Sequence, residues 1–441
     1  MGSFLQKLLF SLVCLEAIAW AQEPPQSQPA QQYSTPKERA KYIRDVGKGG
    51  SEAIPKIEPY VSDPDRDVRL EAVKAVVDIG TQRSLDPLVK ACRDNDPEIQ
   101  IRATDGLVNF YQPGYVKTGL SGSFQKVGSS IKGKFTDTNN QVVDQYVQVR
   151  PEIVAALGKL ASGGASMEAR ANAARAVGIL RGRGAVPDLV QALHSKDTTV
   201  IYESLVALEK IRDEGAGPQL AFLLHDLNEK VQIATIEATG LLLNRGAIET
   251  LRDLLDRSKN MKVKRAALTA MAQMPDPTLH GVYTAYLDHK DDGLREAAAE
   301  GLARLKNPAD RPILEKAYAN ESKTEPRLSA AFGAAALGKR DMGDFDPLRY
   351  LVNNLNSAAY RAVARPYLIE LARDPQVRQA LYPALQQPTA TTDEKTGLAE
   401  VLAASGGQDS IAPLETLSQS TDHDVSDAGL RALKNLRARL P

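Results

Sequence analysis

Apolar residues recur along most of this chain in one repeated pattern. Within a unit they stand at steps 0, 4, 7, 8 and 11, and the unit returns about every 31 residues. These spacings lie on one face of an α-helix. Small residues hold steps 4 and 7, as Ala72 and Ala75 do, so the pattern predicts helices that neighbouring helices approach closely. In this register the units start at Val68, Ile99, Ala169, Val200, Val231, Val263, Leu294, Pro326, Ala358, Asp393 and Val425.

A second amphipathic segment precedes each of these helices, for example at residues 85–92 and 186–193. Gly80 follows the end of one predicted helix as a C-terminal cap does, and Asp63-Pro64 breaks the chain inside a unit. Each unit is therefore a helical hairpin, which buries its apolar face only by stacking on its neighbours. The sequence predicts an all-α fold, a right-handed α-solenoid of about eleven hairpins. Because Pro366 falls inside a predicted second helix, we expect a kink or a break there.

Three stretches of the chain, 63–76, 168–178 and 294–302, resemble the short bacterial HEAT repeat, including the phycobilisome-lyase-like type. The resemblance extends over roughly residues 50–440 and implies the stacked-hairpin fold. Family members are mostly adaptors and scaffolds, with a few enzymes, so the resemblance implies no particular activity. HEAT-type di-iron hydroxylases carry His-Glu dipeptides, and this sequence has none. Nothing in the sequence identifies a bilin site.

The N-terminal segment has the pattern of a secretory signal peptide. Lys7 precedes an apolar stretch at 8–19, and Ala19-Trp20-Ala21 is a cleavage site of the A-x-A kind. We therefore expect residues 1–21 to be removed and the protein to be periplasmic or secreted in a bacterium. A retained anchor, or lipid attachment at Cys14, is the alternative. After cleavage only Cys92 remains, on an apolar helix face where a buried structural thiol is expected.

Four further segments follow the predicted signal peptide. Residues 22–36 are rich in Pro and Gln and read as a flexible linker. Residues 37–112 hold a short helix, at about 37–46, and the first repeats. Residues 113–147 form an insertion rich in Gly, Ser and Lys that loses the helical period, and residues 148–441 continue the solenoid. The insertion is predicted to recognise a partner or to contact a membrane surface, or it is a surface loop without function.

Charge and motifs exclude several function classes. The chain carries 55 basic and 55 acidic residues, whereas a general nucleic-acid binder needs a basic excess. His194 and His225 occupy the same place in adjacent units, but such places lie about 10 Å apart. That separation is too wide for zinc, which sits within about 2.2 Å of its ligands. No phosphate-binding loop, nucleophile elbow or CxxC motif is present. We expect no metal, no cofactor and no catalysis.

Exposed positions of the second helices mix both signs, Arg175, Glu237, Glu300 and Arg304 among them, which predicts a solvated face. An arginine one step into many second helices either ties the adjacent turn or contacts a partner. The residues predicted to bind a partner are Arg69, Arg170, Arg175, Arg295, Lys126, Lys132 and Lys134. The predicted function is a non-catalytic scaffold or adaptor that holds a protein or peptide on the concave face. The alternative is a lyase-like enzyme or a regulatory subunit of an enzyme.

Overall fold

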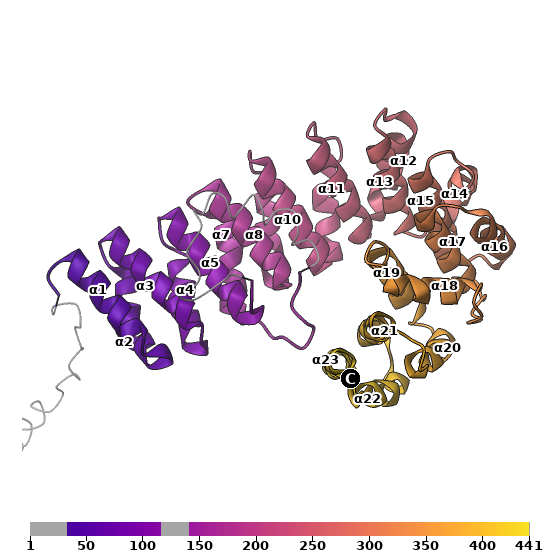
Figure 1. Ribbon diagram of the computed structural model, residues 1–441. Helices are drawn as coiled ribbons and strands as arrows, with labels where there is room; N and C mark the ends of the chain where they lie inside the picture. Colours follow the sequence, from indigo (N-terminus) through magenta and orange to yellow (C-terminus); the bar gives the residue numbers. More distant parts are fainter. Residues whose placement is uncertain (1–32, 116–140, 441) are drawn as a thin grey trace, which may run out of the picture. The chain divides into compact units, whose positions relative to one another are not determined.

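The structure is a computed structural model that describes residues 33–115 and 141–440. Within these residues every regular element is a helix (Figure 1). The predicted signal peptide, most of the predicted linker, and Lys126, Lys132 and Lys134 lie outside them. None of the described helices has the length and apolar character needed to cross a membrane. The chain divides into two compact units, residues 1–87 and 88–441.

The first unit begins with α1 (Pro36–Gly47), at the place where the sequence predicts a short helix at 37–46. The Thr35 hydroxyl accepts the backbone N–H of Glu38, and the Glu38 carboxylate accepts that of Thr35, which completes a capping box. Helix α1 packs against α3 (Arg66–Ile79). Between them lie η2 (Gly50–Ala53), α2 (Ile54–Ile57) and η3 (Glu58–Ser62). After α3 come η4 (Gln82–Ser84) and α4 (Leu85–Ala91), and the boundary between the two units falls within α4.

The second unit is a stack of hairpins whose second helices form one continuous layer. These helices are α5 (Pro97–Tyr111), α8 (Met167–Ile179), α10 (Thr198–Ile211), α11 (Glu229–Leu241), α13 (Met261–Ala272), α15 (Asp292–Leu305), α17 (Thr324–Ala336), α19 (Arg361–Leu371), α21 (Thr392–Ser405) and α23 (His423–Arg439). Each packs on the next, and α5 packs directly on α8. The segment between Tyr111 and Pro151 therefore leaves the stack continuous.

The first helices form a second layer, which is visible at α18, α20 and α22 in Figure 1. They are α7 (Pro151–Gly163), α9 (Val186–Ala192), α12 (Ile248–Arg257), α14 (His280–Tyr286), α16 (Arg311–Asn320), α18 (Pro347–Asn353), α20 (Pro375–Gln386) and α22 (Ile411–Ser418). In one hairpin a 3₁₀ helix, η6 (Glu214–Leu223), takes this place. Counted over the described residues of both units, the chain has eleven second helices, as the repeat pattern predicts.

Local sequence explains where the second helices begin and how closely they pack. An Asp or Asn caps many of them; Asp197, for example, accepts the N–H groups of Thr199 and Val200. Each such cap is worth about 1 kcal/mol. The small residues permit close approach: a Cβ added at Gly240 on α11 would lie 2.7 Å from the Ala270 Cα on α13. The repeat signal therefore sets both helix starts and interhelix spacing.

Two units depart from the predicted register. In most second helices the unit start is the third helical residue, but the third residue of α19 is Val363, not Ala358. Residues 357–360 form a turn, and the alanines in this turn imitate the composition of a repeat unit. The third residue of α21 is Glu394, one after the predicted Asp393. Of the two outcomes expected at Pro366, the break is wrong, since α19 runs through this residue as one helix, and the kink stays a prediction.

Candidate functional site

The second helices of the second unit present one side away from their first helices. Steps 2, 6, 9 and 10 after the third helical residue lie opposite the core positions, because each residue advances the helix by about 100°. We call this side of α8 to α15 the inner face. Its charged and amide side chains are Arg175 on α8, Glu209 and Lys210 on α10, Glu237 on α11, Arg265 and Gln273 on α13, and Glu296, Glu300 and Arg304 on α15, and they lie among apolar residues such as Ile179, Val206 and Ile233. These polar side chains need partners from elsewhere in the chain, water or a bound molecule.

The repeated arginine at the start of the second helices fixes a turn. In three units its guanidinium donates to the backbone carbonyl six residues earlier, in the turn between the two helices. The pairs are Arg69–Asp63 at 3.0 Å, Arg170–Gly164 at 2.9 Å and Arg295–His289 at 2.9 Å. These hydrogen bonds account for the recurrence of the arginine. That the same residues contact a partner stays a prediction.

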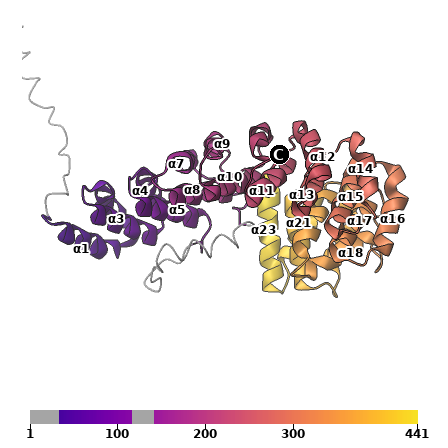
Figure 2. The ribbon, with the colours of Figure 1, turned by 90° about the horizontal axis from the view of Figure 1, so that it is seen from above.

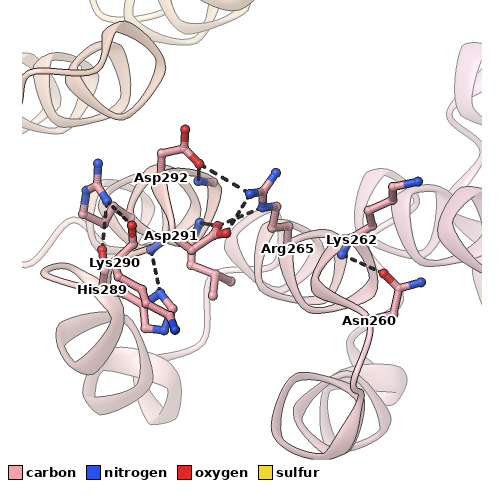
Figure 3. A network of polar contacts seen from close by, with 10 residues as sticks. Asn260, Lys262, Arg265, His289, Lys290, Asp291 and Asp292 are labelled. Carbon is pink, nitrogen blue, oxygen red and sulfur yellow. Dashed lines mark hydrogen bonds and ion pairs between the residues drawn. The ribbon is translucent and has the colours of Figure 1, made fainter.

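Ion pairs also join adjacent hairpins at this edge. Arg265 reaches from α13 to the turn before α15 and donates to both carboxylate oxygens of Asp291, at 2.8 and 2.6 Å (Figure 3). The Asp291 carboxylate also caps α15 through the Leu294 N–H. The hydrogen bonds from Arg265 lower the pKa of Asp291. One repeat further on, Arg295 pairs with Glu321 at 2.7 Å. Such pairs tie one hairpin to the next.

Arg175 is buried, which contradicts its predicted exposure. Its Nε donates to Glu203 on α10 at 3.1 Å, and the two side chains are 2% and 5% exposed. The neighbouring second helix covers Arg175, because both residues lie between α8 and α10. Of the predicted partner-binding residues described, Arg175 is therefore the least accessible to a partner.

Glu300 is also buried, and the Arg304 side chain is only 11% exposed, although the sequence predicts a solvated face there. Arg304 pairs with Glu300 one turn earlier and donates to both oxygens of Glu370 on α19, at 2.9 to 3.2 Å. The Tyr367 hydroxyl lies 3.2 Å from Glu300 and 2.8 Å from the Ser329 hydroxyl. Burial disfavours the charged form of Arg304, but the two carboxylates outweigh it and raise its pKa.

This buried network joins α15, α17 and α19, which belong to three successive hairpins. The Tyr367 ring stacks on Phe332 of α17 with centroids 4.6 Å apart. Arg304 and Glu370 lie 66 residues apart and on hairpins that are not neighbours. At α15 the inner face is thus filled by the protein's own side chains. Sequence reasoning missed the network because its α19 members lie in the misassigned unit.

Three ionisable side chains at α10 and α11 have no hydrogen-bond or ion-pair partner among the described residues: Glu209 and Glu237 on the inner face, and Arg212 at the C-terminal end of α10. Burial and the nearby Glu237 carboxylate raise the pKa of Glu209 to about 8. Glu237 is accessible to solvent, yet the protein around it still raises its pKa. Arg212 is likewise exposed, yet desolvation by the protein around it lowers its pKa, and the charges of Arg181 and Arg373 add to that effect.

The backbone of Arg212 is also unusual. Its φ of 55° is left-handed, as is the φ of 50° at Arg181 in the preceding repeat. Glycine occupies such positions at little energetic cost, whereas other residues pay roughly 1 kcal/mol. Two basic residues thus stand where glycine would be favoured, directly after the second helices α8 and α10.

A cavity of about 570 Å³ lies next to Arg181. It forms between the segment ahead of α7 and the turn after α8. Val147, Val149 and Leu180 supply apolar wall, and Asp144 and Arg181 supply charged groups. Its volume falls in the range of small-molecule and peptide side-chain pockets.

The histidine and cysteine side chains considered in the sequence analysis make structural contacts in the described part of the chain. His194 stacks on Phe222 at 4.5 Å between ring centroids. Among residues 33–115 and 141–440, no group of three or more His, Cys, Asp or Glu side chains could hold a metal ion. Cys92 is buried, and burial raises its pKa to about 12, so it has the character of an unreactive core thiol.

Stacked helical hairpins with an inner layer of second helices define the class of α-solenoids. Within that class the chain belongs to the HEAT-repeat family, whose sequence profile matches residues 30–108, 154–240, 217–280 and 248–335. The match includes the second helices that carry the inner face. It agrees with the resemblance that the sequence shows at 63–76 and 168–178.

Among curated proteins, the chain is similar to phycocyanobilin lyase subunit alpha of Nostoc sp. (strain PCC 7120), with 30% identity over 166 residues. That match spans 35% of this chain and 60% of the relative. Among solved structures, the complex of CpcE and CpcF of phycocyanin lyase from Nostoc sp. PCC7120 is 19% identical, covering 75% of this chain and 96% of that one, with a TM-score of 0.32. Importin beta is 13% identical, covering 90% and 64%, with a TM-score of 0.34.

Proposed function

We propose that this protein is a non-catalytic scaffold or adaptor that binds a protein or peptide on its inner face, over α8 to α13. The observation that carries the proposal is the set of ionisable groups at α10 and α11, Glu209, Glu237 and Arg212, whose side chains have no hydrogen-bond or ion-pair partner among the described residues. Glu237 and Arg212 are exposed, so a bound chain with complementary groups would reach them, and it would stabilise their charged forms, which the surrounding protein disfavours. The charged side chains along the face suit an extended segment that makes many weak contacts along the stack.

A photo-crosslinking experiment in the native cell tests this proposal. A benzophenone amino acid replaces Glu237 on the inner face or, as a matched control, Glu249, an exposed glutamate on the first helix α12. The expected result is a defined crosslinked product from position 237 and none from position 249. Equal products from both positions would contradict the inner face as the binding surface.

We also propose that the protein works in the bacterial envelope or outside the cell. Support comes from the sequence alone: Lys7, the apolar stretch at 8–19 and the Ala19-Trp20-Ala21 site. N-terminal sequencing of the protein purified from the periplasm or medium should begin at Gln22. A protein that remains in the cytoplasm with Met1 intact would refute the proposal.

A second candidate function is a lyase-like protein or the regulatory subunit of an enzyme. The similarity to phycocyanobilin lyase subunit alpha favours it, and that similarity covers only 60% of the relative. Mixing the purified protein with a bilin tests it by absorbance. A saturable spectral shift would support this function, and an unchanged spectrum would favour the scaffold.

A further inference from the structure

The last helix of the chain, α23, lies beside the segment that precedes α7 (Figure 1; Figure 2). The Arg431 guanidinium on α23 donates to both carboxylate oxygens of Asp144, each at 2.8 Å. The two residues are 287 positions apart in sequence. Paired, parallel hydrogen bonds of this kind fix the orientation of the two groups as well as their distance.

Two further contacts lie on the same side of α23. The Asn435 amide oxygen accepts the backbone N–H of Gln145 at 2.8 Å, and the Lys434 ammonium lies 5.9 Å from the Tyr146 ring centroid. Residues 431, 434 and 435 are spaced i, i+3 and i+4, so they share one helix face. We call these six residues, Asp144, Gln145, Tyr146, Arg431, Lys434 and Asn435, the latch.

The segment side of the latch is anchored to the stack. Val143 is buried, and its N–H donates to the Ile179 carbonyl at the end of α8 at 2.9 Å. Asp144 follows directly, so its carboxylate is held next to α8. The latch therefore joins the α8 end of the second unit to its final hairpin, and Figure 1 shows the final hairpins curled back toward α10 and α11. The network at α15 to α19 lies between these two ends of the stack.

We propose that the latch is a reversible closure that controls access to the inner face over α8 to α13. Its contacts are polar, and Arg431 is 63% exposed, so the closure is weak compared with the hydrophobic contacts that hold each hairpin. Buried residues of α23, Leu433 and Leu436, are already part of the hydrophobic core. A weak, charged contact between distant parts of a solenoid opens without unfolding any hairpin.

The closure itself does not depend on the proposed function, and only the consequence for partner access rests on it. The test therefore has two separate parts. The first measures the distance across the latch in the full-length protein without any partner. The second measures crosslinking from position 237 in cells.

For the distance measurement, nitroxide labels are placed at the exposed positions Gln148 and Ala438, after alanine replaces the two native cysteines. Double electron–electron resonance then measures the distribution of distances between the two labels. In dilute salt we expect a single short distance between them. In 1 M salt, where the Debye length falls to about 3 Å, we expect a broad population of longer distances.

Charge reversal supplies the decisive variants. Asp144→Arg or Arg431→Asp should give the long distances in dilute salt, and the double exchange should restore the short one. The matched control is Arg437→Asp, which breaks a 2.8 Å ion pair with Glu415 inside the last hairpin. Circular dichroism melting confirms that each variant is folded.

Unchanged short distances in Asp144→Arg and Arg431→Asp would overturn the closure, as would equal opening in Arg437→Asp. In cells, opened variants should give several-fold more crosslinking from position 237 than the parent protein. Opening without any change in crosslinking would refute control of access while leaving the closure intact. A complete absence of crosslinked products in every variant would refute the proposed function instead.

Discussion

Replacing Arg304 with methionine should destabilise the region from α15 to α19. Methionine keeps the apolar stem but removes the charge that Glu300 and Glu370 share. Glu370 is 31% exposed and gains water, whereas the Glu300 side chain is 7% exposed and does not. Removing one partner of a buried ion pair costs about 3–5 kcal/mol. Because Gln273 and Tyr367 still donate to Glu300, we expect a value near the lower end, about 3 kcal/mol.

Hydrogen exchange measured by mass spectrometry is the appropriate assay, since solenoids can open locally. A loss of about 3 kcal/mol corresponds to roughly a hundredfold faster exchange in peptides from α15 and α17. The matched control is Arg311→Met on α16, whose ion pair with Glu315 is exposed on both sides. That surface pair is worth about 0.2–1 kcal/mol, so exchange should rise by no more than about fivefold.

The double variant Glu300→Gln with Arg304→Met separates the two possible causes. If an unpaired buried charge is responsible, a neutral glutamine at position 300 should recover most of the lost protection. If Arg304→Met is no more harmful than Arg311→Met, or if Glu300→Gln fails to improve it, the assignment of the stability to the buried ion pair is wrong.

Three further predictions concern packing, pH and reactivity. Gly240→Val should lower the free energy of unfolding by about 1–3 kcal/mol in urea, because the new Cβ would lie 2.7 Å from the Ala270 Cα. The control Gly281→Val should lack this clash, since no atom lies within 4 Å of a Cβ at that position. Glu209 has a pKa raised from 4.5 to about 8, so the folded state binds its proton more tightly and loses stability as pH rises through that window. Glu209→Gln should therefore be more stable than the parent above pH 8 and similar near pH 4, as thermal melts would show. Cys92 should react with a thiol reagent only after unfolding, and rapid reaction of the native protein would contradict its burial.

The fold follows from the sequence because its determinants are local. Caps such as Asp197 bond to residues two and three positions later, and small residues such as Gly240 face the next hairpin. Each of these signals lies within about one repeat of the residues that it affects. The register failed only where the composition imitates the pattern, at Ala358, and by one residue at Asp393.

The candidate site was far less predictable, because its contacts cross several repeats. Arg304 and Glu370 are 66 residues apart, and Asp144 and Arg431 are 287 apart. A helical pattern identifies the face on which a residue lies, but not how strongly the stack curves or what meets that face. The same charged pattern therefore predicts a solvated surface at Glu300, where the curvature of the stack buries it.

Departures from the repeat, rather than the repeat itself, mark the places where distant parts of this chain meet. In α19, Tyr367 stands four steps after Val363, where most other units have a small residue, and its hydroxyl donates to Glu300 two hairpins earlier. Asp144 lies in the segment that interrupts the helical period, and it holds the last helix. A regular repeat optimises contacts between neighbours, so residues that serve longer-range contacts must break its pattern. The irregular positions are therefore where substitutions should change the curvature and closure of the second unit without disturbing its individual hairpins.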